Sequence, residues 1–223
     1  MATAAATMRV TGVGGTGVVT VAQVLAAAGA RAGLKVTGLD QLGLAQKGGA
    51  VVSDVRLSTS AIAGSNKIGP GGCDLYLGCD ALVAASQQNL AVIAPDRTYA
   101  VVSTSVTPTG TMVTDTRTEY PSRQTLVDRI EWAGSRPENI FVDARAQLGA
   151  LGEDQYANIF LLGAAVQAGV LPIAPEHIEW ALELNGVQVS RNLDAFRLGR
   201  RYVTEVWAGS GDTARPDAVV LTA

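Results

Sequence analysis

The sequence predicts a doubly wound α/β fold with a mostly parallel sheet and a helical cap at the C-terminal end. Three observations lead to this expectation. A glycine-rich run at residues 12–17 joins a short apolar segment to a long amphipathic one. Short Val-rich segments then alternate with helical patterns, and the last third of the chain carries helical patterns alone. A strand, a glycine loop and a helix in this order open the Rossmann-like folds.

Six short apolar runs are the expected strands. The segment Ala50–Leu57 is a nearly continuous apolar run broken only by Ser53 and Asp54, which favours a strand buried on both faces. The Thr-rich stretch Thr104–Tyr120 is expected to be an extended excursion or an edge strand. The full set of expected strands is Met8–Val13, Lys35–Leu39, Ala50–Leu57, Asp74–Leu77, Tyr99–Ser103 and Ile140–Asp143.

Six segments carry helical signals. In the first of them, apolar residues recur at helical spacing from Val18 to Ala28, and Gly33 ends the pattern. Ser122 is a suitable N-cap, and Pro175 suits a first helical turn. The expected helices are Thr16–Arg31, Ala81–Leu90, Ser122–Trp132, Gln155–Ala168, Pro175–Asn185 and Val189–Val206. We therefore expect one domain over residues 8–202, followed by a tail or linker over residues 203–223.

Composition narrows the classes of function. The chain has 223 residues, a net charge of −3 and 17 scattered basic residues, which argues against nucleic-acid binding. Charged residues make up only 17%, which suggests a surface partly covered by a partner; an Ala/Val-rich composition is the alternative explanation. Residues 1–7 lack a signal-peptide pattern and no 18-residue apolar run occurs, so we expect a cytoplasmic protein without a membrane segment.

The glycine loop is the first candidate site. Gly12, Gly14 and Gly17 satisfy the G-x-G-x-x-G pattern, in which backbone amides at a helix N-terminus face phosphate groups; Gly15 and Thr16 lie between them. Asp40 lies at the end of the second strand, where an acid that binds a ribose is expected, although its distance from Gly12 is longer than usual. One interpretation is a nicotinamide dinucleotide site, and the other is a packing loop or a site for another phosphate ligand.

Residues for catalysis are scarce. The only histidine, His177, is expected at the surface near a helix start, and Glu153 and Asp154 suit a helix N-terminus. Cys73 and Cys79 are too few for a four-thiolate cluster and are expected to be buried, reduced thiols. We expect neither a catalytic residue nor a metal site in this chain. A chain with a loop suited to a small ligand but without catalytic residues is more typical of a component of a larger enzyme than of a complete enzyme.

A second loop, residues 43–50, places a lysine between apolar residues and two glycines. Lys47 is the best candidate to meet an anionic ligand or a partner's carboxylate, beside Gly48 and Gly49. The alternative is a solvated loop lysine. Both loops follow strands, and open α/β sheets bind ligands at the carboxyl ends of their strands.

Several motifs in order resemble the gamma domain of 2-oxoacid:ferredoxin oxidoreductases, over roughly residues 8–202. The later motifs are similar to the indolepyruvate:ferredoxin oxidoreductase branch. The motifs are 12–20 (Gly-Val-Gly-Gly-Thr-Gly-Val-Val-Thr), 44–53 (Leu-Ala-Gln-Lys-Gly-Gly-Ala-Val-Val-Ser), 77–80 (Leu-Gly-Cys-Asp), 158–164 (Asn-Ile-Phe-Leu-Leu-Gly-Ala), 171–173 (Leu-Pro-Ile), 181–187 (Ala-Leu-Glu-Leu-Asn-Gly-Val) and 192–200 (Asn-Leu-Asp-Ala-Phe-Arg-Leu-Gly-Arg).

This resemblance implies an enzyme that oxidatively decarboxylates a 2-oxoacid with coenzyme A, giving acyl-CoA, CO2 and reduced ferredoxin. In the indolepyruvate branch the substrates are aryl pyruvates. Thiamine diphosphate and [4Fe-4S] clusters lie in partner subunits or domains, and the gamma domain packs against them. This chain has neither the thiamine-binding G-D-G…N motif nor a four-cysteine run, so it binds neither group alone. The resemblance makes coenzyme A or a neighbouring domain the expected contact of the two loops.

Two other functions stay open at this stage. One is a stand-alone NAD(P)-binding oxidoreductase, and the other is an interaction or regulatory protein that keeps a Rossmann-like shell. The sequence does not decide whether the chain is a separate subunit or part of a fused one.

Overall fold

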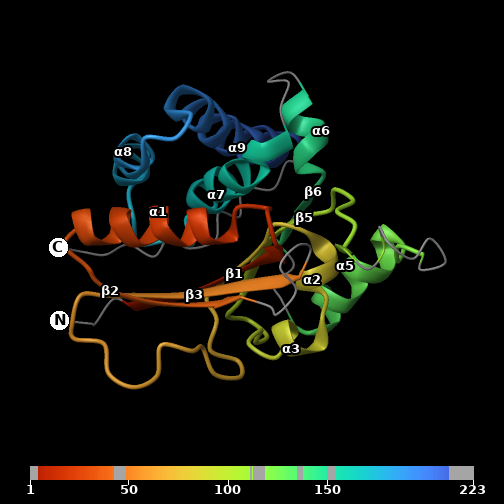
Figure 1. Cartoon of the computed structure of the whole chain (residues 1–223), viewed down its shortest axis with the longest axis horizontal. Coiled ribbons are helices and arrows are strands. Elements are labelled where there is room, and N and C mark those ends of the chain that lie inside the picture. The colour runs from red at the N-terminus through yellow and green to blue at the C-terminus, as the bar shows by residue number, and fades with distance from the viewer. Residues whose placement is uncertain are drawn as a thin grey trace.

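A single six-stranded sheet organises the chain (Figure 1). The computed structural model describes residues 5–42, 49–110, 112, 119–134, 138–149 and 154–210. The strand order is β2-β3-β1-β4-β5-β6, in which β1, β4, β5 and β6 run parallel and β3 runs antiparallel to both of its neighbours. The strands are β1 (Ala5–Val13), β2 (Lys35–Leu42), β3 (Ala50–Ser58), β4 (Leu75–Gly78), β5 (Tyr99–Ser103) and β6 (Ile140–Val142).

Helices cover both faces of the sheet, so the expected doubly wound α/β fold is confirmed. Helix α1 (Val18–Arg31) and helix α7 (Ala157–Gln167) cover one face, and α8 (Pro175–Asn185) packs on α1 while α9 (Val189–Ser210) packs on α7. Together α8 and α9 form the expected C-terminal cap (Figure 1). The other face carries α2 (Ala81–Ala84), α3 (Gln87–Leu90) and α5 (Arg123–Trp132). Helix α6 (Ala144–Leu148) follows β6, and a 3-10 turn, η2 (Asp154–Tyr156), precedes α7.

Most of the expected elements are present, with some differences. Where one helix was expected over Ala81–Leu90, the structure has the two short helices α2 and α3. The side-chain Nδ2 of Asn89 in α3 donates to the Val83 carbonyl in α2 and to the Thr11 hydroxyl in β1, which accounts for the break. Helix α6 was not expected. The described part of Thr104–Tyr120 contains no strand, so the edge-strand interpretation is wrong there.

The C-terminal helix is longer than the sequence pattern indicates. Helix α9 runs to Ser210, past the expected end at Val206 and into the segment 203–223 that we expected to be a tail. Where the domain ends therefore stays a prediction. No helix in the described residues is long and apolar enough to cross a membrane.

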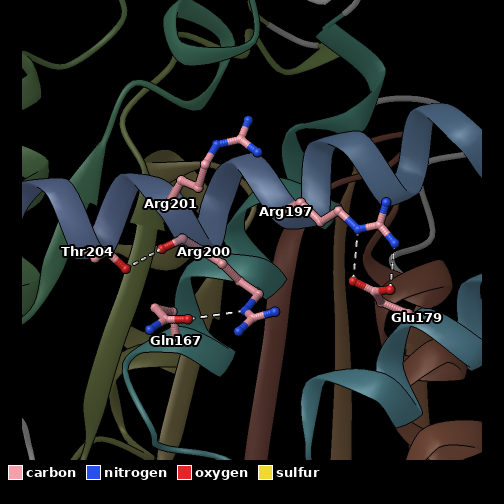
Figure 2. A pocket seen from close by; sticks show the side chains of 6 residues that line it. All are labelled: Gln167, Glu179, Arg197, Arg200, Arg201 and Thr204. Atoms are coloured by element: carbon pink, nitrogen blue, oxygen red, sulfur yellow. Dashed lines mark hydrogen bonds and ion pairs between the residues drawn. The ribbon is translucent and has the colours of Figure 1, made fainter.

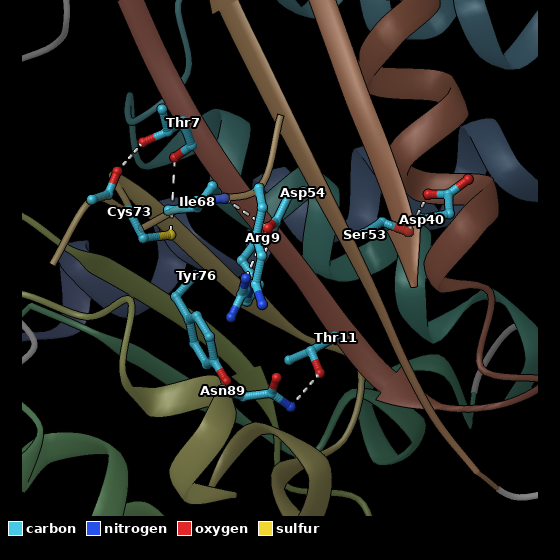
Figure 3. Close-up of polar contacts among 12 residues, drawn as sticks. Thr7, Arg9, Thr11, Asp40, Ser53, Asp54, Ile68, Cys73, Tyr76 and Asn89 are labelled. Carbon is cyan, nitrogen blue, oxygen red and sulfur yellow. Dashed lines mark hydrogen bonds and ion pairs between the residues drawn. The ribbon is translucent and has the colours of Figure 1, made fainter. Parts of the chain in front are cut away.

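A buried ion pair joins β1 to β3 at the centre of the sheet (Figure 3). Arg9 Nε and Nη2 donate to the two carboxylate oxygens of Asp54 at 2.7 and 2.8 Å, and the two residues are direct partners in the strand register. The backbone amide of Ile68 also donates to Asp54, at 2.9 Å. Both side chains are almost fully buried, so each charge depends on the other.

Two glycines let α7 and α9 cross at backbone contact. A Cβ atom added at Gly163 would overlap the carbonyl oxygen of Phe196, and one added at Gly199 would overlap the carbonyl oxygen of Phe160. Only glycine fits at such a crossing. Both glycines lie in the motifs quoted above, and this packing is a physical reason for their presence there.

Candidate functional site

The glycine loop forms a tight turn between β1 and α1. Gly15 and Gly17 have positive φ angles of 98° and 80°, a region that favours glycine. The amide and the hydroxyl of Thr16 both donate to the Val13 carbonyl, at 3.0 and 2.7 Å. These bonds fix the start of α1 over the carboxyl end of β1.

The glycines of the loop have different physical roles. A Cβ atom at Gly12 would meet Thr16 and Cys79, and one at Gly17 would overlap the side-chain amide of Asn158. A Cβ atom at Gly15 would meet nothing within 4 Å. Gly12 and Gly17 therefore serve close packing, whereas Gly15 faces open space that a ligand can approach.

Helix α1 begins at this loop without a side-chain cap. Gly17 is its N-cap residue and contributes no side-chain hydrogen bond, and no acidic residue lies in the first turn. The first amides of a helix have no partners within the helix, and the helix dipole is positive at this end. The loop therefore offers the groups that bind a phosphate or a carboxylate.

Asp80 closes the crevice between β1 and β4. Its carboxylate is fully buried and accepts hydrogen bonds from the amides of Val13, at 2.5 Å, and Val83, at 2.8 Å. Burial raises the pKa of Asp80, and these amide hydrogen bonds oppose that rise. The helix after β1 and the helix after β4 lie on opposite faces, so this crevice is a switch point, where open α/β sheets bind ligands.

Asn158 joins the C-terminal helices to the same loop. Its Nδ2 donates to the Gly17 carbonyl at 3.2 Å, and its Oδ1 is buried without a hydrogen-bond partner among the described residues. An unpartnered buried acceptor is unusual, because such groups are almost always paired. A ligand or partner that brings a donor to this loop would satisfy it.

The two predicted loops meet at one backbone hydrogen bond. The amide of Gly14 donates to the carbonyl of Gly49 at 2.7 Å, which continues the pairing of β1 with β3. Six of the predicted site residues, Gly12, Gly14, Gly15, Thr16, Gly17 and Gly49, therefore lie together. Lys47 and Gly48 lie outside the described residues.

Asp40 is not at the glycine loop. It lies within the edge strand β2, and β3 separates that strand from β1. Its carboxylate accepts a hydrogen bond from Ser53 at 2.6 Å (Figure 3). The expectation of a ribose-binding acid at Asp40 is wrong, because a strand inserted between β1 and β2 moves it one strand further away.

The remaining candidates have no catalytic geometry. Burial raises the pKa of Cys73 to about 12 and that of Cys79 further still, so both thiols stay protonated, as expected for buried cysteines. His177 lies in the first turn of α8, near a helix start as expected, where it is half-buried, and its Nδ1 has no partner in the described structure. No group of metal-ligating side chains occurs among the described residues.

The last two candidates are the neighbouring acids Glu153 and Asp154. Asp154 begins the short 3-10 turn η2, and Glu153 lies outside the described residues.

A second polar cluster lies at the carboxyl ends of β5 and β6. Ser103 donates to Ser105, and Ser105 donates to Asp143 at 2.7 Å. This hydrogen bond lowers the pKa of Asp143, which also caps α6 through the amide of Ala146. The arrangement fixes the edge of the sheet beside Arg145, whose Nη1 donates to the Val106 carbonyl at 3.1 Å.

Sequence reasoning missed Asp80 and Asn158 as site residues, although both lie in the quoted motifs. Each carries a signal. Asp80 is an acid two residues after a buried strand, and Asn158 is a polar residue in the first turn of a mostly apolar helix. What could not be read from the chain is that both contact one loop, since Asn158 lies 141 positions from Gly17.

The chain matches one protein family over most of its length. Residues 7–202 match the model of the family described as pyruvate ferredoxin/flavodoxin oxidoreductase. Among curated proteins, the indolepyruvate oxidoreductase subunit IorB of Archaeoglobus fulgidus is 28% identical over 193 residues, which cover 85% of this chain and 91% of that protein.

Solved structures share the fold. The 2-oxoglutarate:ferredoxin oxidoreductase from Magnetococcus marinus, with 2-oxoglutarate, coenzyme A and succinyl-CoA bound, has a TM-score of 0.65 at 20% identity, over 97% of this chain and 33% of that chain. The gamma subunit of a keto/oxoacid ferredoxin oxidoreductase from Geobacter sulfurreducens PCA has a TM-score of 0.61 at 20% identity, over 90% of this chain and 99% of that one. Pyruvate oxidoreductase subunit PORC from Thermotoga maritima has a TM-score of 0.62 at 19% identity, over 88% and 96%. This chain thus spans a third of the length of the first of these and almost all of the other two.

Proposed function

The chain belongs to the pyruvate ferredoxin/flavodoxin oxidoreductase family, and from this premise we propose that it is the gamma component of a 2-oxoacid:ferredoxin oxidoreductase. The assembled enzyme would convert a 2-oxoacid and coenzyme A into acyl-CoA and CO2 and pass the electrons to ferredoxin. Aryl pyruvates are the proposed substrates, on the strength of the 28% identity to an indolepyruvate oxidoreductase subunit.

The chemistry of decarboxylation and electron transfer is assigned to partners. Thiamine diphosphate, when bound by a partner, supplies the carbanion chemistry that decarboxylation requires. This chain has two cysteines, both buried with raised pKa values, so it does not offer the four thiolates of an iron–sulfur cluster. The proposed roles of the chain are therefore to scaffold the complex and to help bind coenzyme A.

The glycine loop is the proposed place where coenzyme A is contacted. The single observation that carries this proposal is the uncapped start of α1 beside Gly15, whose surface is open. Coenzyme A carries several phosphates, and a helix N-terminus stabilises such groups. The carbonyl of Gly49 accepts a hydrogen bond from the amide of Gly14 in this loop, and Gly49 is two positions from Lys47 in the sequence.

The test compares two lysine variants in the assembled enzyme. We expect Lys47→Ala to raise the KM for coenzyme A by about tenfold, or to weaken assembly, because a lysine–phosphate contact is charge-assisted. The variant should unfold at the same denaturant concentration as the wild type. Lys35→Ala is the matched control, since Lys35 begins β2 level with Ala5 at the start of β1, the end of that strand opposite the glycine loop. An unchanged KM together with unchanged assembly in Lys47→Ala would reject the proposed role.

A stand-alone NAD(P)-binding oxidoreductase is the alternative, and it rests on the G-x-G-x-x-G pattern alone. The position of Asp40 weighs against it. The third alternative, a regulatory protein, predicts a chain that is functional without thiamine-binding and iron–sulfur partners. Co-purification with brown, cluster-bearing partners under native expression would exclude that alternative.

A further inference from the structure

A group of arginines lies on the outer face of the C-terminal cap, away from the glycine loop. An open groove of about 460 Å³ lies between α9, the end of α7 and the middle of α8 (Figure 2). All the residues that line it are polar or charged, namely Gln167, Glu179, Arg197, Arg200, Arg201 and Thr204. Three arginines and one glutamate give the groove a net charge of +2 (3 − 1), on a chain whose net charge is −3.

Arg197 shows how this groove binds a carboxylate. Its Nε and Nη2 donate to the two oxygens of Glu179 at 2.9 and 2.7 Å, which is a two-point contact. This hydrogen bonding lowers the pKa of Glu179. Asp194 and Glu183 also act on Arg197 electrostatically. The charge of Arg197 is therefore already balanced from within the chain.

Arg200 is held in place by a neutral partner, and the carboxylate of Glu179 acts on it electrostatically without a direct ion pair. The Nε of Arg200 donates to the neutral side chain of Gln167 at 3.1 Å, and its guanidinium lies 6.0 Å from the ring centre of Phe196. Neither Arg200 nor Arg201 forms an ion pair with any residue that the structure describes. A guanidinium that is positioned in advance loses little freedom when it binds an anion.

The shape of the groove favours a protein segment over a small ligand. Small-molecule sites are enclosed and lined mostly by hydrophobic side chains, whereas this groove is lined by polar and charged side chains and is open to solvent, and the Arg197 side chain is 48% exposed. Arginine is also enriched at protein interfaces. The helical spacing of Arg197, Arg200 and Arg201 places their charges within about one turn of α9, which suits a short run of carboxylates.

We propose that this groove docks an acidic segment of another protein chain, with Arg200 and Arg201 as the contacting residues. Glu179 occupies one guanidinium and so limits the number of carboxylates that the groove accepts. This surface is distinct from the loop proposed to meet coenzyme A, so either proposal can fail while the other holds.

The test measures binding of a fluorescein-labelled oligoglutamate peptide to the full chain by fluorescence anisotropy at low salt. The double variant R200Q/R201Q should bind about tenfold more weakly, because two exposed charge contacts are lost. Glu179→Gln should bind about threefold more tightly, because it releases Arg197 for the peptide. A gain of affinity cannot result from unfolding.

The matched control is K67Q/R129Q, which removes the same charge from two exposed basic residues: Lys67, next to the buried Ile68, and Arg129 of α5, both on the face of the sheet opposite the C-terminal cap. This control should leave the affinity unchanged. The proposal is overturned if the wild type does not bind the peptide, if the control weakens binding as much as R200Q/R201Q, or if Glu179→Gln fails to tighten it. Displacement of the peptide by an equal concentration of inorganic phosphate would also overturn it, in favour of a small-oxyanion site.

Discussion

Two aspartates at the carboxyl edge of the sheet show how local partners determine a pKa. Burial raises the pKa of Asp80, although two backbone amides donate to its carboxylate. Asp143 is half-exposed, and the hydroxyl of Ser105 lowers its pKa. A hydrogen bond to the charged form dominates where water still reaches the group, whereas desolvation dominates where it does not.

The lowered pKa of Asp143 predicts a pH-dependent contribution to stability. A group whose folded pKa is depressed stabilises the fold above its unfolded pKa and loses that contribution as pH falls through the folded value. We expect Asp143→Asn to lower the free energy of unfolding by about 1 kcal/mol at neutral pH, because the charge-assisted hydrogen bond from Ser105 becomes a weaker, neutral one. The difference from the wild type should begin to shrink below about pH 4, where the carboxylate of the unfolded chain becomes protonated, and should disappear as pH falls through the lower pKa of the folded protein.

Urea unfolding of both proteins at several pH values measures this difference. Asp128→Asn, on the exposed face of α5, is the control and should show a much smaller change at neutral pH. A difference for Asp143→Asn that stays constant from neutral pH to pH 3 would show that the charge of the carboxylate has no part in the effect.

Helix packing is decided at the scale of whole elements, and it can reverse the usual preference of a residue. Alanine normally stabilises a helix by about 1 kcal/mol relative to glycine. At Gly163 and Gly199 the added methyl group would overlap a backbone carbonyl of the facing helix. We expect Gly163→Ala and Gly199→Ala each to lower the free energy of unfolding by about 3 kcal/mol, because α7 and α9 must separate.

Chemical unfolding followed by circular dichroism tests this expectation. Gly149→Ala is the matched control, since a Cβ atom there meets nothing within 4 Å and its φ is −49°. The control should stay close to the wild type. A stabilising effect at Gly163 would mean that the two helices do not cross at backbone contact.

The sequence predicts elements well where the signal is local. Pro175 and Asn185 bound a helix that begins and ends as expected, and Ser122 caps α5 through the amide of Thr125. The break between α2 and α3 could not be predicted in this way. It depends on the contact of Asn89 with Thr11, which lies 78 positions away.

The order of the strands belongs to the whole molecule and was beyond the reach of local patterns. A Val-rich run favours burial, and β3 is indeed an interior strand, but nothing local says that it enters antiparallel between β1 and β2. For the same reason the glycine loop could be predicted as a site, whereas Asp80 and Asn158 could not be joined to it. Contacts between residues far apart in the sequence decide both the strand order and which residues meet at the glycine loop.

That strand order carries a prediction about nicotinamide cofactors. A ribose-binding acid has to lie on the strand next to β1, and here Asp40 lies two strands away and is bonded to Ser53. We expect the isolated chain to show no saturable binding of NADH when it is titrated by calorimetry or by cofactor fluorescence. Tight binding of NADH would reject the gamma-component proposal and favour the stand-alone oxidoreductase.

The buried pair of Arg9 and Asp54 has a consequence for how the chain avoids misfolding. The two residues face each other across β1 and β3. A slip of one residue between these strands would turn one side chain to the opposite face and leave two buried charges without partners. The misaligned pairing is therefore less stable than the native one, because its buried charges are unpaired. The pair therefore favours the native register of β1 and β3, the two strands whose ends are joined by the hydrogen bond between Gly14 and Gly49.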